Sequence, residues 1–145
     1  MMHKDLEKKL IKNFPNLYVD MYKINTCMEY GITCDDGWYE LINNLSVEIE
    51  SWCIKNKLRI KATQVKEKFG SLRFYIELID ESSTWDQTQY TELSDIIYKY
   101  EKLSSETCEV TGNIGKLKIK GYLYKTLCNE SAILLGFDDV KKNET

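Results

Sequence analysis

One long apolar stripe, between positions 35 and 57, constrains the fold of this chain more than any other feature. The stretch reads DDGWYELINNLSVEIESWCIKNK, and its apolar residues recur every three or four positions: Trp38, Leu41, Ile42, Leu45, Ile49, Trp52 and Cys53. This spacing places them on one side of a single helix, and a stripe of that width has to be buried against other elements. Asp35 or Asp36 can cap the helix, and the acidic start suits the helix dipole.

An alternating pattern of apolar and polar residues follows, from about Arg59 to Ile79, and predicts a β-hairpin. Gly70-Ser71 is a candidate two-residue turn, which would set Lys68 directly opposite Arg73. One face is then mainly apolar and holds Val65, Glu67, Phe69, Leu72, Phe74 and Ile76. The other face holds Gln64, Lys66, Lys68, Arg73, Tyr75 and Glu77. We expect the helices to pack on the apolar face.

The alternation changes phase near the start of this hairpin. Ile60 and Ala62 are apolar at even positions, whereas Val65 and Phe69 are apolar at odd ones. A β-bulge near Thr63-Gln64, or a strand that begins there, would account for the change.

Three more helices are predicted. Positions 3 to 14 carry apolar residues at a spacing of four and end at Pro15. A second helix begins at a capping-box pattern of Thr84 with Gln87 and reaches about Leu103. Its buried face would hold Tyr90, Leu93, Ile97 and Tyr100. A short helix over positions 129 to 135 ends at Gly136.

The order helix, helix, hairpin, helix, small strands, helix is typical of an α+β fold, with helices packed on a β-hairpin or small antiparallel sheet. We divide the chain into a core over residues 1–104, a ribbon-like subdomain over 105–137 packed on the core, and a polar tail over 138–145.

Composition limits the function classes. The chain has 145 residues with 43% hydrophobic content, which is enough for one domain with a core. Its net charge of -3 disfavours general nucleic-acid binding. The charged start MMHKDLEKKL does not fit a signal peptide, and no apolar run is long enough to cross a membrane. We therefore expect a cytoplasmic protein whose five cysteines are reduced.

Histidine is nearly absent, because His3 is the only one. This excludes catalytic sites built on Ser-His-Asp or Cys-His and zinc sites that need histidine ligands. An acid or base would have to be a carboxylate, lysine, tyrosine or cysteine, and Asp35, Asp36 and Glu67 are the candidate carboxylates.

Two short segments near the C-terminus each look like half of a zinc knuckle. In Cys108-Glu-Val-Thr111 and Cys128-Asn-Glu-Ser131, a hydroxyl residue stands where a second cysteine would be needed. Neutral hydroxyls are poor zinc ligands, and structural zinc is held by four thiolate or imidazole groups. We predict a degenerate zinc-ribbon-like unit with no metal and no cofactor. A disulfide between Cys108 and Cys128 stays open as an alternative, although a reducing compartment disfavours it.

The polar face of the predicted hairpin is the candidate binding site, and it consists of Lys66, Lys68, Arg73 and Tyr75. Like charges opposite each other in a sheet are destabilising unless something negative relieves them. Two interpretations remain: a solvated face relieved by acidic side chains from elsewhere, or a platform for a phosphate or carboxylate, using the forked donors of Arg73.

Four segments together resemble a family of small proteins from phages, prophages and bacteria, for which no activity is established. The family pattern is GFECGDGWxxLIxxL, QVKEKFGxLRFY, CExCGxxG and GWxxTLCxxH. This chain has YGITCDDGWYELINNL, QVKEKFGSLRFY, TCEVTGNIG and GYLYKTLC, spread over about 100 residues. It departs from the pattern at Thr111, at Tyr122 in place of tryptophan, and at Ser131. The resemblance implies a phage or mobile-element origin and an accessory role.

Our leading hypothesis is a non-enzymatic phage accessory protein that acts in the host cytosol. It would counter a host defence function by binding a host defence protein or an anionic nucleotide signal. One alternative is a histidine-free enzyme that degrades such a signal through Asp35, Asp36 or Glu67. Another is a weak nucleic-acid-binding protein. The sequence leaves the partner and the oligomeric state open.

Overall fold

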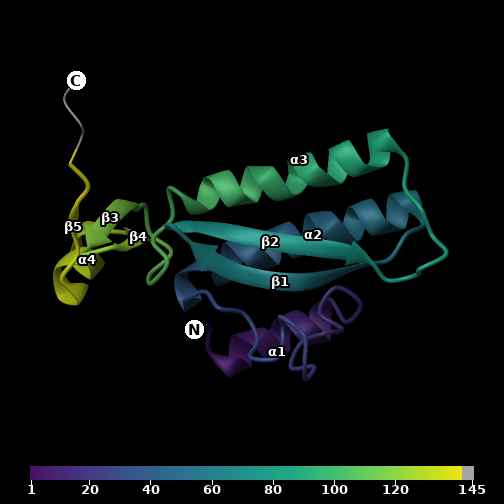
Figure 1. Ribbon diagram of the computed structural model, residues 1–145, viewed down its shortest axis with the longest axis horizontal. Helices are drawn as coiled ribbons and strands as arrows, with labels where there is room; N and C mark the ends of the chain where they lie inside the picture. The colour runs from purple at the N-terminus through teal and green to yellow at the C-terminus, as the bar shows by residue number, and fades with distance from the viewer. Residues whose placement is uncertain (142–145) are drawn as a thin grey trace.

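The structure is a computed structural model, and it describes residues 1–141. Its elements are α1 (Lys4–Asn13), the 3-10 turn η1 (Asp36–Trp38), α2 (Tyr39–Asn56), β1 (Ile60–Lys68), β2 (Ser71–Leu78), α3 (Gln87–Ser104), β3 (Lys116–Lys120), β4 (Leu123–Leu127), α4 (Asn129–Leu135) and β5 (Asp138–Asp139). Helices and small antiparallel sheets make up the fold, so the α+β prediction is confirmed (Figure 1). No helix within residues 1–141 combines the length and apolarity needed to cross a membrane.

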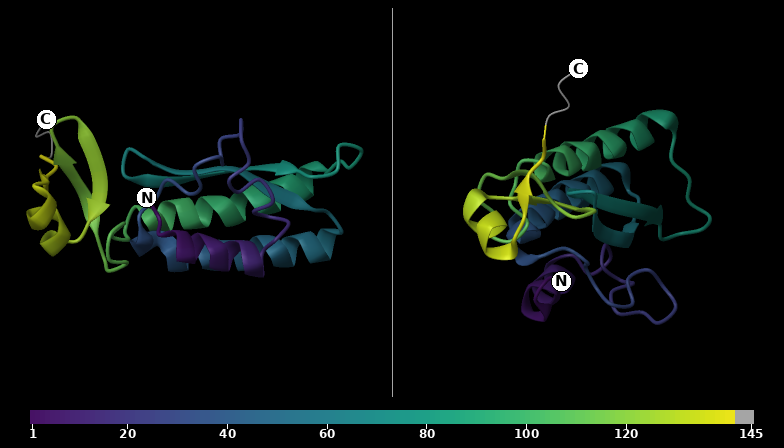
Figure 2. Two further views of the ribbon diagram at one scale, coloured as in Figure 1. Left: turned by 90° about the horizontal axis from the view of Figure 1, so that it is seen from below. Right: turned by 60° about the vertical axis from the view of Figure 1, so that its left-hand side comes forward.

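The β1–β2 hairpin covers a layer formed by α1, α2 and α3 (Figure 2). The apolar stripe of α2 is buried beneath the hairpin, and Trp38, Leu45, Ile49 and Trp52 belong to the same core cluster as Val65, Leu72, Phe74, Leu93 and Ile97. The helices therefore pack on the apolar face, as expected. Tyr90 is an exception on α3, because its side chain is 45% exposed.

The hairpin turn lies one residue earlier than predicted. Its central residues are Phe69 and Gly70, with φ of 52° and 84°, and this pair of positive angles matches the twist of a hairpin. Lys68 consequently pairs with Ser71 rather than Arg73. The register differs from the prediction by an even number of residues, so every strand residue keeps its predicted face. Only Phe69 leaves the apolar face, and it lies at the tip with 67% of its surface exposed.

The predicted β-bulge is present. The register of β1 against β2 shifts between Ala62 and Gln64, which leaves Thr63 as the extra residue. The outer edge of β1 is covered by the segment before α2, because Ala62 donates its N–H to the Leu17 carbonyl.

Both predicted caps of the long helices are wrong. Asp86 and Gln89 form the capping box of α3, two residues after the predicted pair. Neither Asp35 nor Asp36 caps α2, because the chain first turns through η1. The Asp36 carboxylate instead accepts the N–H of His3, which ties the start of α1 to the start of α2.

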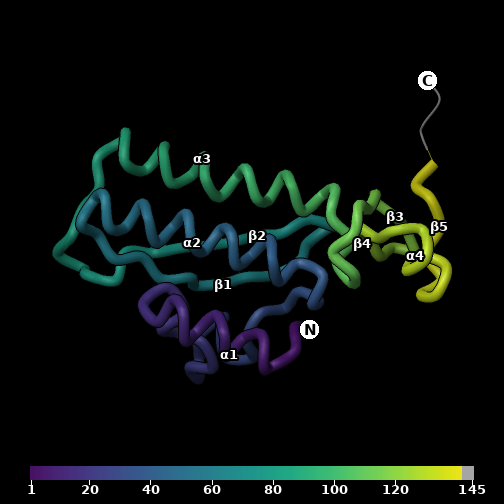
Figure 3. The backbone as a smooth tube through the Cα atoms, turned by 180° about the vertical axis from the view of Figure 1, so that it is seen from behind, coloured from purple at the N-terminus to yellow at the C-terminus, as the bar shows by residue number. Residues whose placement is uncertain are grey.

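The C-terminal segment forms a small separate layer at one end of the core (Figures 1 and 3). Its sheet has the order β4-β3-β5, and α4 packs beside it with Gly136 as its left-handed cap, as predicted. The C-terminal sheet includes the first two residues of the predicted polar tail, because Asp138 and Asp139 pair with β3. Positions 142–145 lie outside the described residues.

Candidate functional site

The structure brings the four predicted site residues onto the outer face of the hairpin. Lys66 lies directly opposite Arg73, while Tyr75 pairs with Gln64 and Lys68 with Ser71. Lys68 is exposed, Tyr75 is 46% exposed, and Lys66 and Arg73 are half-buried. The facing pair of cations is therefore Lys66 with Arg73.

These three cations lack the usual partners. None of the ion pairs formed within residues 1–141 includes Lys66, Lys68 or Arg73. The Lys68 ammonium lies 5.7 Å from the centre of the Phe69 ring. The three cations thus share a surface on which no carboxylate in the described part of the chain makes an ion pair.

The Arg73 guanidinium is held in place but not saturated. Its Nη1 donates to the Ser71 hydroxyl at 2.7 Å. Glu101 lies close enough for Arg73 to act on its pKa: burial raises that pKa, and the backbone N–H of Phe74 and then Arg73 partly offset the rise. An arginine has five N–H donors, so Arg73 keeps donors for an incoming phosphate or carboxylate.

Each of the candidate catalytic carboxylates makes a structural contact, and two of them, Asp35 and Glu67, lie close enough to Lys125 to raise its pKa. Glu67 accepts the N–H of Gly70 at 2.8 Å and closes the hairpin turn. Asp36 accepts the His3 N–H at 2.7 Å. Asp35 lies 2.8 Å from the terminal nitrogen of Met1 and 3.8 Å from Lys125 Nζ. Each carboxylate thus has a structural partner.

The two half-knuckles meet in space as a mixed group of two thiols and two hydroxyls. Ser131 Oγ lies 3.2 Å from Cys128 Sγ and 3.7 Å from Cys108 Sγ. Thr111 Oγ1 lies 3.8 Å from Cys128 Sγ. No group of three or more histidine, cysteine or acidic side chains in the described chain is arranged to hold a metal. This donor set does not fit zinc, because two of its four members are neutral hydroxyls.

Cys108 is distinctive within this group. Burial of its thiol acts to raise the pKa, but hydrogen-bond contacts with Thr111, the Cys128 backbone and Ser131 outweigh burial and lower the pKa to about 7. Sequence spacing indicated the group, but it gave no sign of the lowered pKa, which depends on side chains that only the fold brings together.

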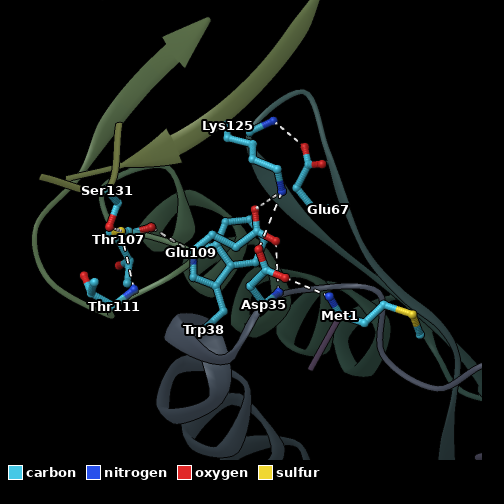
Figure 4. A network of polar contacts seen from close by, with 11 residues as sticks. Met1, Asp35, Trp38, Glu67, Thr107, Glu109, Thr111, Lys125 and Ser131 are labelled. Carbon is cyan, nitrogen blue, oxygen red and sulfur yellow. Dashed lines mark hydrogen bonds and ion pairs between the residues drawn. The ribbon is translucent and has the colours of Figure 1, made fainter. Parts of the chain in front are cut away.

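A polar network that sequence reasoning missed connects the C-terminal layer to the start of α2 (Figure 4). Glu109 is buried, and its carboxylate lies 3.1 Å from Lys125 Nζ and accepts the Asp35 N–H at 3.0 Å. Burial raises the pKa of Glu109, although the contacts with Asp35 and Lys125 partly offset it. For Lys125, burial acts to lower the pKa, but Glu109 outweighs burial and raises it. The network is a structural junction.

A comparison of the chain with family models, curated proteins and solved structures finds no match in any of the three.

Proposed function

We propose that this protein acts by binding rather than by catalysis, and that Lys66, Lys68, Arg73 and Tyr75 contact an anionic ligand or an anionic patch on a partner. One observation carries the proposal. Three cations share the outer face of the hairpin, and none has an ion-pair partner among the described residues. Facing like charges are unfavourable by under about 1 kcal/mol, and a bound anion would relieve this cost.

The chemistry of the face suits a phosphate-bearing ligand. An arginine can bind two oxygens of a phosphate or carboxylate at once, and lysines add point charge. Tyr75 offers an exposed ring beside Arg73 for stacking on a base. A nucleotide signal fits this combination, and an acidic patch on a protein fits the cations alone.

The biological role that we propose is that of a phage accessory protein that counters a host defence function in the host cytosol. Support comes from the resemblance of four segments to small phage and prophage proteins. Asp35, Asp36 and Glu67 each make a structural contact. Because these carboxylates are already engaged, we favour binding over the alternative of a nucleotide-degrading enzyme. The net charge of -3 disfavours the nucleic-acid alternative.

The test uses Arg73→Glu and Lys66→Glu, which reverse the two facing charges. The wild-type protein and both variants are purified from defence-bearing cells, and bound nucleotides and proteins are identified by mass spectrometry. We expect both variants to lose the partner while staying folded, because neither half-buried cation makes an ion pair within residues 1–141 whose loss would destabilise the protein. Binding should also weaken as salt is raised.

Lys9→Glu is the matched control, because Lys9 is an exposed lysine on α1 that no ion pair within residues 1–141 includes. It should keep the partner. If both hairpin variants keep the partner at wild-type level, the face is only solvated and the proposal fails. If a bound nucleotide is converted over time, the protein is an enzyme.

A further inference from the structure

The outer edge of β2, on the side away from β1, is only partly closed. The N–H of Leu72 donates to the Ser104 hydroxyl at 2.8 Å, and the N–H of Phe74 donates to the Glu101 carboxylate at 3.0 Å. Both acceptors lie in the last turn of α3. Side chains of α3 therefore replace a neighbouring strand along the first half of β2.

The second half of this edge has no such cover. N–H groups on one edge of a strand recur at every second residue, so Ile76 and Leu78 point their N–H groups the same way as Leu72 and Phe74. Ile79 supports this phase, because its N–H donates toward β1, to the Arg59 carbonyl at 2.9 Å. No acceptor for the Ile76 or Leu78 N–H lies on that edge among the described residues. Figure 1 shows α3 diverging from β2 toward this end.

A cavity of about 480 Å³ lies beside the open edge. Ile76 and Leu78 line it together with Trp85 from the loop before α3. The Trp85 ring packs edge-on against the buried Trp52, with 6.4 Å between ring centres. The cavity thus has a rigid aromatic wall, which is a common anchor point at protein interfaces.

The surroundings of the edge are acidic. Glu77, Asp80 and Glu81 also line the cavity. Asp80 is paired with Arg59, whereas no ion pair within the described chain includes Glu77 or Glu81. An occupant of this edge should therefore carry positive charge.

We propose that the open edge of β2 binds an extended basic segment of a partner protein as an added β-strand. The backbone groups of Ile76 and Leu78 pair with the segment, and this mode of recognition needs only a free strand edge. Alternate side chains of an added strand point to opposite faces. Apolar ones enter the cavity against Trp85, and basic ones lie beside Glu77. A second copy of this chain fits less well, because symmetric pairing of two β2 edges about Glu77 would set carboxylate against carboxylate.

This inference concerns the edge of β2 and does not depend on the proposed role of its outer face. The probe is the peptide acetyl-Arg-Val-Arg-Leu-Arg-Val-amide, titrated into the full chain by calorimetry. The first control peptide has alternate backbone nitrogens methylated, and the second has glutamate in place of arginine. We expect methylation to weaken binding by about tenfold or more, because each methyl group on a nitrogen that faces β2 removes a backbone hydrogen bond. The acidic peptide should not bind.

Hydrogen exchange measured by NMR locates the bound strand. The amides of Ile76 and Leu78 should exchange more slowly with the basic peptide present, while those of Leu72 and Phe74 should not change. Glu77→Lys and Glu81→Lys should each weaken binding by about threefold or more at low salt. Glu130→Lys, an exposed charge reversal on α4, should leave binding unchanged.

Several results would overturn the proposal. They are the absence of binding at millimolar peptide, equal binding of the methylated or acidic peptide, and protection at amides elsewhere. Slower exchange of the same amides on raising the concentration of the protein alone would assign the edge to self-association instead. Trp85→Ala adds a second readout, because it should weaken binding of the basic peptide. If this variant unfolds, the binding measured for Glu77→Lys and Glu81→Lys decides the proposal.

Discussion

Trp38 is the residue on which the core and the C-terminal layer both depend. Its ring is fully buried, and its indole N–H donates to the carbonyl of Thr107 at 2.8 Å. Trp38→Ala should lower the free energy of unfolding by about 3–5 kcal/mol, because it leaves a large cavity. Trp38→Phe should cost less, since it fills most of the space and loses mainly the hydrogen bond. Urea unfolding of both variants measures this, and an unchanged melting temperature with lost binding would make Trp38 a contact residue instead.

Cys108 gives the stability of the protein a predictable dependence on pH. Its folded pKa of about 7 lies below the 9.0 of a free thiol. Between these two values Cys108 binds fewer protons in the folded protein than in the unfolded chain, so its contribution to stability should rise with pH. The gain is complete above the unfolded pKa and is lost as the pH falls through the folded one. Unfolding by urea at a series of pH values in this window measures the slope.

Cys108→Ser is the control for this slope, because serine does not ionise in this range. The variant should lose the rise in stability between about pH 7 and pH 9. The difference in ultraviolet thiolate absorbance between the wild-type protein and Cys108→Ser gives an independent titration of Cys108, because the other four cysteines are common to both. A difference curve centred at the value of a free cysteine would contradict the contacts described around Cys108.

At the scale of elements, the β1–β2 turn carries backbone strain at Phe69. Its φ of 52° is a conformation that residues other than glycine adopt rarely, whereas asparagine tolerates it. Phe69→Asn should therefore raise stability by about 0.4–1 kcal/mol. Phe69→Val should lower it, because a β-branched residue fits this conformation worst. Thermal unfolding of the pair separates the backbone effect from loss of the exposed ring, which both variants share.

For the whole molecule, the pair of buried Glu109 and half-buried Lys125 connects the two layers. Lys125→Met should lower the free energy of unfolding by up to about 3 kcal/mol, because it leaves the buried Glu109 carboxylate with the Asp35 N–H but without a cation. Adding Glu109→Gln should recover part of that loss. A double-mutant cycle by urea unfolding measures the coupling. Additive effects would show that the pair does not act as a unit.

Features that depend only on neighbouring residues could be predicted from the order of the amino acids. The buried stripe of α2 follows from its 3.6-residue period, and the bulge at Thr63 follows from a change in phase of apolar residues. The end of α4 follows from a glycine free to take a φ of 78°. The sorting of Lys66, Lys68, Arg73 and Tyr75 onto one face also followed, because faces alternate with period two and an even register shift preserves them.

Which residues face each other and which become buried together depends on how the two layers pack. The turn settles on Phe69-Gly70 because Gly70 packs against the C-terminal layer. A Cβ there would lie 2.5 Å from Leu117 Cδ1, and the Thr126 hydroxyl donates to the Gly70 carbonyl at 2.6 Å. These partners lie far along the chain, as does Glu109 from Asp35. No local pattern of residue types encodes such contacts, since they exist only once the two layers have packed.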